Sequence, residues 1–259
     1  MCFDLDSRPP IIPIAGGALD SHRLVLTADD GAEFLAVRAR AAQPTGAAIL
    51  ILPDVRGLHP FYEDLALRFA ETGTDALAID YFGRTAGTDL PRDDAFDYRP
   101  HVERTTREGL GADVRAAVAD LRSADGGSAR SMFTIGFCFG GRLAFMTAAM
   151  GLDLAGVIGF YGRPTARNAG DAPSPTDVVG TMQGGILGLF GGEDPVIPPE
   201  AIEAFDAALT AAGVDHRLVI YPGAPHSFFD KKASDFADAS AAAWGEVLRF
   251  VRERTAPPA

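Results

Sequence analysis

The sequence predicts an α/β fold with a mostly parallel, doubly wound sheet and an N-terminal β-hairpin. Three observations support it: a hairpin signal near the start, continuous apolar runs that alternate with amphipathic stretches afterwards, and the absence of an internal repeat. With 259 residues, 47% of them hydrophobic, the chain can bury a substantial core. We expect residues 1–20 to form an extended lead-in and residues 21–259 to form one domain without a large cap.

The hairpin is predicted from residues 22–27 and 33–38, where apolar and polar side chains alternate around Asp29-Asp30-Gly31. The later strands are expected to be parallel, because continuous apolar runs are typical of strands that are covered on both faces. These strands are predicted over residues 47–52, 75–79, 132–135, 154–160, 186–190 and 216–221.

Amphipathic stretches between these strands predict the helices. Residues 105–123 form the longest of the internal ones and keep their apolar side chains on one face. Residues 199–212 begin with proline and are followed by Gly213, which is the usual asymmetry of helix ends. Residues 164–184 are rich in Pro, Gly and Thr and are expected to form a surface excursion. The remaining helices are predicted over residues 61–72, 139–150 and 234–254.

Composition and charge narrow the possible partners. The formal net charge of −12 argues against binding to nucleic acid or to an anionic membrane. No apolar run approaches the roughly 20 residues that a membrane helix needs. Two cysteines do not make a disulfide framework in a chain of this length, and the first residues lack the features of a signal peptide. We expect a cytoplasmic protein that acts on a small molecule, with no nucleic-acid or membrane partner and an oligomeric state left open.

The most informative motif is Gly-Phe-Cys-Phe-Gly-Gly at residues 136–141, between a predicted strand and a predicted helix. A nucleophile flanked by glycines at such a turn is the nucleophile elbow of α/β-hydrolases. The turn is so sharp that its flanking positions tolerate almost no side chain. Taken alone, a cysteine after a strand is more often a small core residue. In this pattern, Cys138 is the predicted nucleophile.

Two further loops at the carboxyl ends of predicted strands carry an acid and a base. The chain order nucleophile, acid, histidine is that of α/β-hydrolases and differs from the chymotrypsin and subtilisin orders. His226 would accept the thiol proton, and an acid would fix its tautomer and stabilise its charged form. Asp194 is the preferred acid because it immediately precedes Pro195, where the loop leaves the strand, and Glu193 is the alternative.

The other histidines have no spacing typical of metal ligands, and the chain has no cysteine pair for zinc. A P-loop and a dinucleotide fingerprint are also missing from the sequence. We therefore expect no metal and no cofactor. These other histidines are His22, His59, His101 and His216.

These motifs together resemble the dienelactone hydrolase family, also called carboxymethylenebutenolidases, from about residue 25 to the C-terminus. The resemblance implies an α/β-hydrolase fold and hydrolysis of a lactone or another carboxylic ester, without a cofactor. It implies a Cys-His-Asp triad and an acyl-enzyme, with Cys138 as nucleophile, His226 as base and Asp194 as acid. The backbone N–H groups of Val55 and Phe139 would form the oxyanion hole.

The same resemblance implies residues that bind the substrate or activate the thiol. Residues 52–57 match a turn that carries an extra carboxylate, usually Glu, which pairs with the resting thiol; here it is Asp54. Arg84 matches an arginine that binds the carboxylate of the substrate. A second arginine is expected four residues after the histidine, where this chain has Asp230. Either Lys231 or Lys232 replaces that cation, or the natural substrate is a different ester or lactone.

One alternative belongs to a different functional class. A non-catalytic α/β-hydrolase scaffold could bind a ligand or sense redox state, because an elbow also activates its thiol towards oxidation. Cys138 would then be an oxidisable thiol and not a nucleophile towards esters. The presence of His226 and Asp194 argues against this alternative, since a sensor needs no triad.

Overall fold

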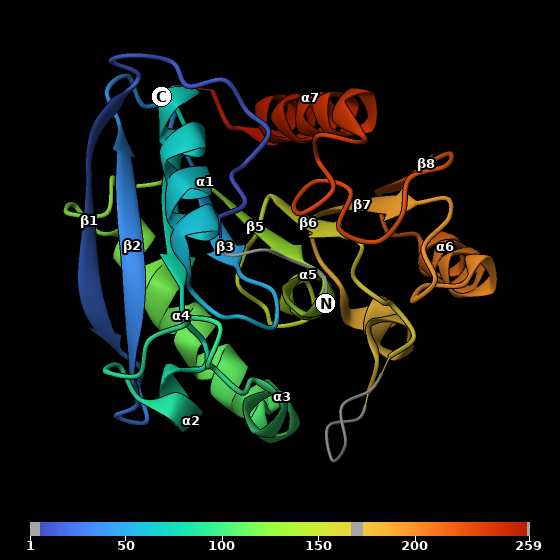
Figure 1. The fold of residues 1–259 in the computed structure, drawn as a ribbon, viewed down its shortest axis with the longest axis horizontal. Coiled ribbons are helices and arrows are strands. Elements are labelled where there is room, and N and C mark those ends of the chain that lie inside the picture. The colour runs from blue at the N-terminus through green and yellow to red at the C-terminus, as the bar shows by residue number, and fades with distance from the viewer. Residues whose placement is uncertain (1–5, 167–172, 258–259) are drawn as a thin grey trace.

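The computed structural model describes residues 6–166 and 173–257 of the chain. One eight-stranded sheet runs through the described part, with helices on both faces (Figure 1). The strand order is β1-β2-β4-β3-β5-β6-β7-β8. The strands are β1 (Ala18–Thr27), β2 (Glu33–Ala41), β3 (Ala47–Leu52), β4 (Asp75–Ile79), β5 (Ser131–Phe137), β6 (Gly156–Phe160), β7 (Gly185–Gly191) and β8 (His216–Tyr221).

The sheet is mostly parallel, as the sequence predicts. β2 runs antiparallel to both of its neighbours, β1 and β4, whereas every pair from β4 through β3 to β8 is parallel. Strands β3 to β7 are buried along their whole length, which explains their continuous apolar runs. The predicted α/β fold is therefore confirmed.

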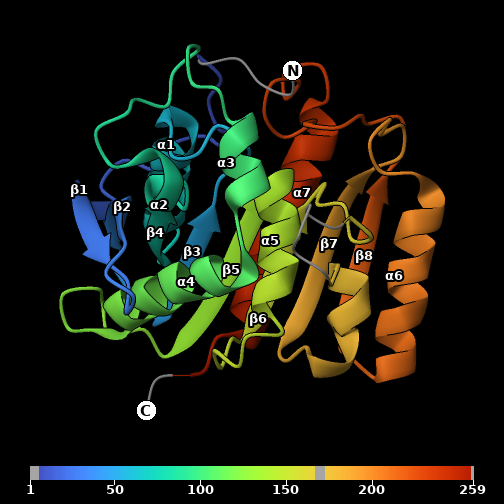
Figure 2. The ribbon, with the colours of Figure 1, turned by 90° about the horizontal axis from the view of Figure 1, so that it is seen from below.

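Two layers of helices cover the sheet. Helices α1 and α7 pack on one face, and α4, α5 and α6 pack on the other (Figure 2). Helix α1 begins after His59, whose ring accepts a hydrogen bond from the Phe61 N–H, and α6 ends at Gly213 in the left-handed region, as predicted. These helices are α1 (Pro60–Glu71), α4 (Arg107–Arg122), α5 (Phe139–Thr147), α6 (Pro199–Ala212) and α7 (Ala237–Arg254).

Three segments differ from the sequence prediction. Two short helices, α2 (Gly83–Ala86) and α3 (Arg99–Arg104), were not predicted, because neither is long enough to show a helical repeat. The predicted surface excursion contains a 3₁₀ helix, η1 (Pro175–Thr181), while residues 167–172 lie outside the described residues. None of the helices in the described part of the chain combines the length and apolar composition that a membrane crossing requires.

The N-terminal segment packs against the domain over much of its length. Strand β1 already begins at Ala18, inside the predicted lead-in, because its pairing with β2 extends beyond the alternating pattern. Before that strand, Arg8 forms an ion pair with Asp64, and the Ile14 N–H donates to Glu71, both on α1. Residues 1–5 lie outside the described residues.

Candidate active site

Cys138 lies at the turn that joins β5 directly to α5. Its backbone has φ 54° and ψ −114°, a conformation that costs a non-glycine residue about 1–3 kcal/mol. A side chain at Gly136 or Gly140 would collide with backbone: a Cβ at Gly136 would lie 2.0 Å from the Gly140 carbonyl oxygen, and one at Gly140 would lie 2.0 Å from that of Pro53. The glycines of the motif are thus required by close backbone packing around a half-buried thiol.

His226 and Asp194 meet at the carboxyl ends of β7 and β8. The His226 Nδ1 atom lies 2.6 Å from Asp194 Oδ2. Asp194 is held in turn by the backbone N–H groups of Val196 and Ile197, which donate to its other oxygen at 2.7 and 3.2 Å. Asp194 is buried and the neighbouring Glu193 is exposed, so Asp194 is the acid that contacts the histidine.

Cys138 and His226 line one pocket of about 230 Å³. Its walls are mainly apolar, with side chains from Val55, Val102 and Val196 among them. This volume is below the usual range of about 300–1,000 Å³ for ligand pockets, so it suits a small ligand.

Val55, in the turn after β3, and Phe139, the first residue of α5, both line this pocket. The close approach of Gly140 to the Pro53 carbonyl shows that the turn after β3 packs directly on the start of α5. Within the described part of the chain, neither the Val55 nor the Phe139 backbone N–H donates to a protein acceptor. Two N–H groups without a protein acceptor, in residues that line the pocket beside Cys138, are of the kind that an oxyanion hole requires.

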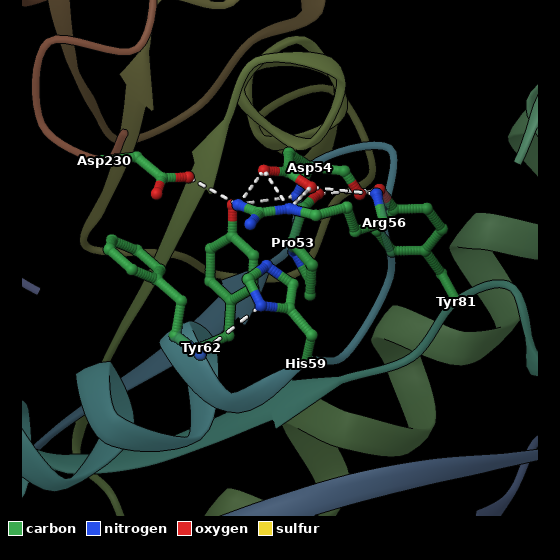
Figure 3. Close-up of polar contacts among 8 residues, drawn as sticks. Pro53, Asp54, Arg56, His59, Tyr62, Tyr81 and Asp230 are labelled. Atoms are coloured by element: carbon green, nitrogen blue, oxygen red, sulfur yellow. Dashed lines mark hydrogen bonds and ion pairs between the residues drawn. The ribbon is translucent and has the colours of Figure 1, made fainter. Parts of the chain in front are cut away.

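A buried ionic cluster lies in the turn after β3. The Arg56 guanidinium sits between the carboxylates of Asp54 and Asp230 (Figure 3). Its Nε lies 3.0 and 3.1 Å from the two Asp54 oxygens, and its Nη2 lies 2.6 Å from Asp54 Oδ2 and 2.5 Å from Asp230 Oδ2. The three side chains are at most 4% exposed. The backbone of this turn is also held by Tyr62, whose hydroxyl oxygen accepts from the Asp54 N–H at 3.0 Å.

Comparison with known proteins places the chain in a family. The model of the dienelactone hydrolase family matches residues 35–255. The chain belongs to the dienelactone hydrolase family. Membership makes it a carboxylic ester hydrolase with the α/β-hydrolase fold.

Individual relatives agree with this assignment. A protein of Yersinia pestis named "Putative carboxymethylenebutenolidase" is 30% identical over 228 residues, which cover 84% of this chain and 83% of the relative. A protein of the same name from Escherichia coli (strain K12) is 28% identical and covers 86% and 83%. The structure of a dienelactone hydrolase-like promiscuous phosphotriesterase from metagenomic libraries has the same fold, with a TM-score of 0.76, 22% identity and coverage of 93% and 100%.

Asp54 does not take the position that the family resemblance implied. Among the described residues, its carboxylate oxygens accept hydrogen bonds only from the side chain and backbone of Arg56, and none from the thiol of Cys138. Burial raises the pKa of Asp54, but the charge and hydrogen bonds of Arg56 outweigh burial and hold the pKa below its ordinary value. Asp54 is thus a charged partner of Arg56, and the predicted contact with Cys138 is absent.

The predicted substrate-binding cations also lie elsewhere. The Nε of Arg84 lies 2.9 Å from both oxygens of the buried Asp113, and its Nη1 lies 2.6 Å from Asp30. Arg84 is therefore occupied by carboxylates and is not part of the pocket lining. Lys231 and Lys232 are exposed and line a neighbouring cavity of about 210 Å³, which shares His226 with the first pocket.

The pocket contains cations that the sequence analysis missed. Arg142 is buried and its guanidinium carbon lies 5.0 Å from the centre of the Phe139 ring. Arg163 is exposed at the pocket wall, just after β6. Arg142 could have been found from the sequence, because it follows Cys138 by four residues and so shares its face of the helix. For Arg163 the sequence holds no such signal.

Tyr161 forms the pocket wall beside the histidine. Its ring centre lies 4.9 Å from that of His226, and its backbone has a positive φ of 38°. The hydroxyl is buried and has no hydrogen-bond partner among the described residues. Burial raises the pKa of this phenol well above its ordinary value, so the hydroxyl stays protonated. It packs against His226 as a neutral wall.

The remaining histidines have local roles. His59 caps α1, and burial followed by the Arg56 charge lowers its pKa to about 3, so its ring is neutral. His101 contacts Thr85 at 2.9 Å, and His216 contacts Asp206 at 3.2 Å. No group of three or more His, Cys, Asp or Glu side chains in the described residues is arranged to hold a metal ion.

Proposed function

We propose that this protein hydrolyses small lactones or other carboxylic esters with Cys138 as nucleophile, His226 as general base and Asp194 as its orienting acid. The observation that supports this most is the pairing of two features in one pocket. One is a thiol on a strained elbow, and the other is a histidine whose Nδ1 lies 2.6 Å from a buried carboxylate. Asp194 fixes the tautomer that leaves Nε2 as the proton acceptor.

Acylation follows from this arrangement. His226 accepts the thiol proton, and the Cys138 sulfur attacks the ester carbonyl carbon, so that a C–S bond forms and the carbonyl oxygen becomes an oxyanion. The N–H groups of Val55 and Phe139 donate to that oxyanion. When the intermediate collapses, the C–O bond of the ester breaks and the leaving alkoxide takes the proton from His226. The product of this step is a thioester on Cys138.

Deacylation uses the same groups in reverse. Water attacks the thioester carbon while His226 accepts a proton from it, and the same two N–H groups stabilise the second oxyanion. Collapse breaks the C–S bond and releases the carboxylic acid and the thiol. Asp54 binds Arg56 through both of its oxygens, and its expected part in activating the thiol stays a prediction.

The pocket favours a small substrate with a negative charge. In a chain with a net charge of −12, the charged side chains that line this pocket in the described part of the chain, apart from the reacting thiol and base, are Arg142 and Arg163. An arginine pair binds carboxylates through charge-assisted hydrogen bonds. We therefore assign substrate recognition to Arg142 and Arg163, in place of Arg84, Lys231 and Lys232.

Turnover of p-nitrophenyl acetate tests this proposal. Cys138→Ala and His226→Ala are expected to lower kcat at least about a thousandfold, because a nucleophile and its base act as a unit. Cys2→Ala is the matched control and should retain wild-type activity. Activity that survives in Cys138→Ala would refute the nucleophile assignment. A wild-type protein that hydrolyses no ester or lactone, but whose Cys138 is readily oxidised by peroxide, would favour the redox-sensing alternative.

A further inference from the structure

Arg56 connects two loops that carry different parts of the proposed machinery. It lies in the turn after β3, next to Val55, and its Nη2 reaches Asp230, which is 174 positions away in the sequence. Asp230 lies in the segment after β8, four residues beyond His226. The Asp54 carboxylate completes the cluster and holds Arg56 from within its own turn. The oxyanion turn and the histidine loop are thus joined through one guanidinium.

We propose that Arg56 and Asp230 are positioning residues that hold the Val55 N–H in register with His226. The proposal rests on the function given above, and it adds a role for two side chains that are not among the residues lining the pocket. A misplacement of about 1 Å in a catalytic group can lower a rate about a hundredfold. A buried ion pair that fixes the position of the oxyanion donor relative to the base therefore preserves the catalytic rate.

The histidine loop is held by apolar packing and by polar contacts, and among the polar contacts Arg56 is the one that comes from the oxyanion turn. Phe228 and Phe229 are fully buried, with ring centres 6.2 and 4.7 Å from that of Phe160. At the next residue the chain turns back, because the Asp230 N–H donates to the Ser227 carbonyl at 3.1 Å. A displacement of Asp230 would therefore pass through one tight turn to the residue beside His226.

The oxyanion turn has anchors of its own on the opposite side. The Tyr81 hydroxyl lies 2.6 Å from the Pro53 carbonyl and 2.8 Å from that of Asp54, and Tyr62 holds the Asp54 N–H. These contacts fix the turn to the sheet and to α1. The contact of the oxyanion turn with the histidine loop is made by Arg56, through its ion pair with Asp230. The two kinds of anchor therefore have separable functions.

Charge balance identifies the variant that tests the proposal most cleanly. Two carboxylates and one guanidinium give the buried cluster a net charge of −1. Asp230→Ala leaves a neutral Asp54–Arg56 pair, so the fold should tolerate it. Removing Arg56 instead would leave two unpaired buried carboxylates, which is strongly destabilising. Asp230→Asn is the conservative variant, because its amide oxygen can still accept from Arg56.

The experiment compares ester turnover with thiol alkylation. Asp230→Ala is expected to lower kcat for p-nitrophenyl acetate about ten- to a hundredfold, with KM nearly unchanged, because both oxyanions lose an aligned donor. Alkylation of Cys138 by iodoacetamide, measured by peptide mass spectrometry, forms no oxyanion and should stay within about threefold of the wild type. Asp230→Asn should recover most of the lost kcat.

A second buried ion pair provides the structural control. Arg38 pairs with Asp120, with side chains 9% and 12% exposed, and joins β2 to α4. Asp120→Ala should lower the thermal stability and leave kcat unchanged. The positioning role is refuted if Asp230→Ala keeps kcat within about twofold of the wild type, if Asp120→Ala loses as much kcat, or if alkylation falls in parallel with turnover. A wild type inert towards esters, or an active Cys138→Ala, would refute the proposed function itself.

Discussion

Asp230 should make the stability of this protein depend on pH in a direction opposite to that of most carboxylates. Its side chain is 3% exposed, and burial raises its pKa from 3.8 to about 6, although the charge of Arg56 opposes the shift. The folded state therefore holds this proton more tightly than the unfolded chain does. Between about pH 3.8 and 6, ionisation of Asp230 lowers the free energy of unfolding as the pH rises.

The size of the effect follows from the shift. A pKa raised by about two units, at 1.36 kcal/mol for each, means that ionised Asp230 lowers the free energy of unfolding by about 3 kcal/mol. This destabilisation is absent below pH 3.8 and complete above pH 6. Asp230→Asn removes the titrating group but keeps the oxygen that accepts from Arg56. The free energy of unfolding of this variant, relative to the wild type, should thus increase by about 3 kcal/mol between pH 3.5 and pH 8.

Urea unfolding at a series of pH values measures that difference directly. Subtracting the wild type from the variant at each pH cancels the contributions of the other carboxylates. The control is Asp153→Asn, which neutralises a fully exposed carboxylate and should give a flat difference. A flat or falling difference for Asp230→Asn would refute the reasoning, since it would mean that burial does not raise the pKa of Asp230 above its value in the unfolded chain.

Four other substitutions, one of them a control, test the packing of the elbow and the roles of two arginines. Gly140→Ala should destabilise the fold by about 3 kcal/mol or more, because its Cβ would meet backbone at 2.0 Å. Its control is Gly245→Ala in α7, whose Cβ meets nothing within 4 Å and which should stabilise the fold by about 0.5–1 kcal/mol. Urea unfolding measures both changes. Arg163→Ala should raise KM about tenfold for an anionic lactone and leave KM for p-nitrophenyl acetate unchanged. Arg84→Ala should leave kcat/KM unchanged but lower the stability by about 2 kcal/mol, because the buried Asp113 loses its partner.

The fold could be predicted from the sequence, and so could the placement of Cys138 and His226 in one pocket and the contact of His226 with Asp194. Parallel buried strands require continuous apolar runs, and the sharp turn at Cys138 requires glycines that remain visible in the sequence. Asp194 and His226 follow strands whose carboxyl ends lie at one edge of the sheet, so their meeting depends on topology alone. Backbone packing thus makes the positions of Cys138, Asp194 and His226 predictable from the sequence.

The substrate-facing residues were not predictable in the same way. The role of each candidate substrate-binding residue depends on the direction of its long side chain and on the group that this side chain contacts. The resemblance assigns Arg84 to the substrate, whereas in the structure its guanidinium pairs with Asp113 and Asp30. Val102 reaches the pocket from α3, a helix of six residues that has no readable repeat. Such contacts arise from tertiary packing, which the sequence pattern does not encode.

Two departures from the family pattern, at Asp54 and at Asp230, have one structural explanation. The shorter Asp54 folds back on its own turn, where its Oδ1 accepts from the Arg56 N–H at 2.8 Å. The resemblance implied an arginine at position 230, and the chain instead has an acid there and an arginine at position 56. In this chain the cation lies in the oxyanion turn, and its pairing with Asp230 joins that turn to the histidine loop. With its cation enclosed by two carboxylates, the cluster can stabilise the loops but cannot bind a substrate anion, which leaves that role to Arg142 and Arg163.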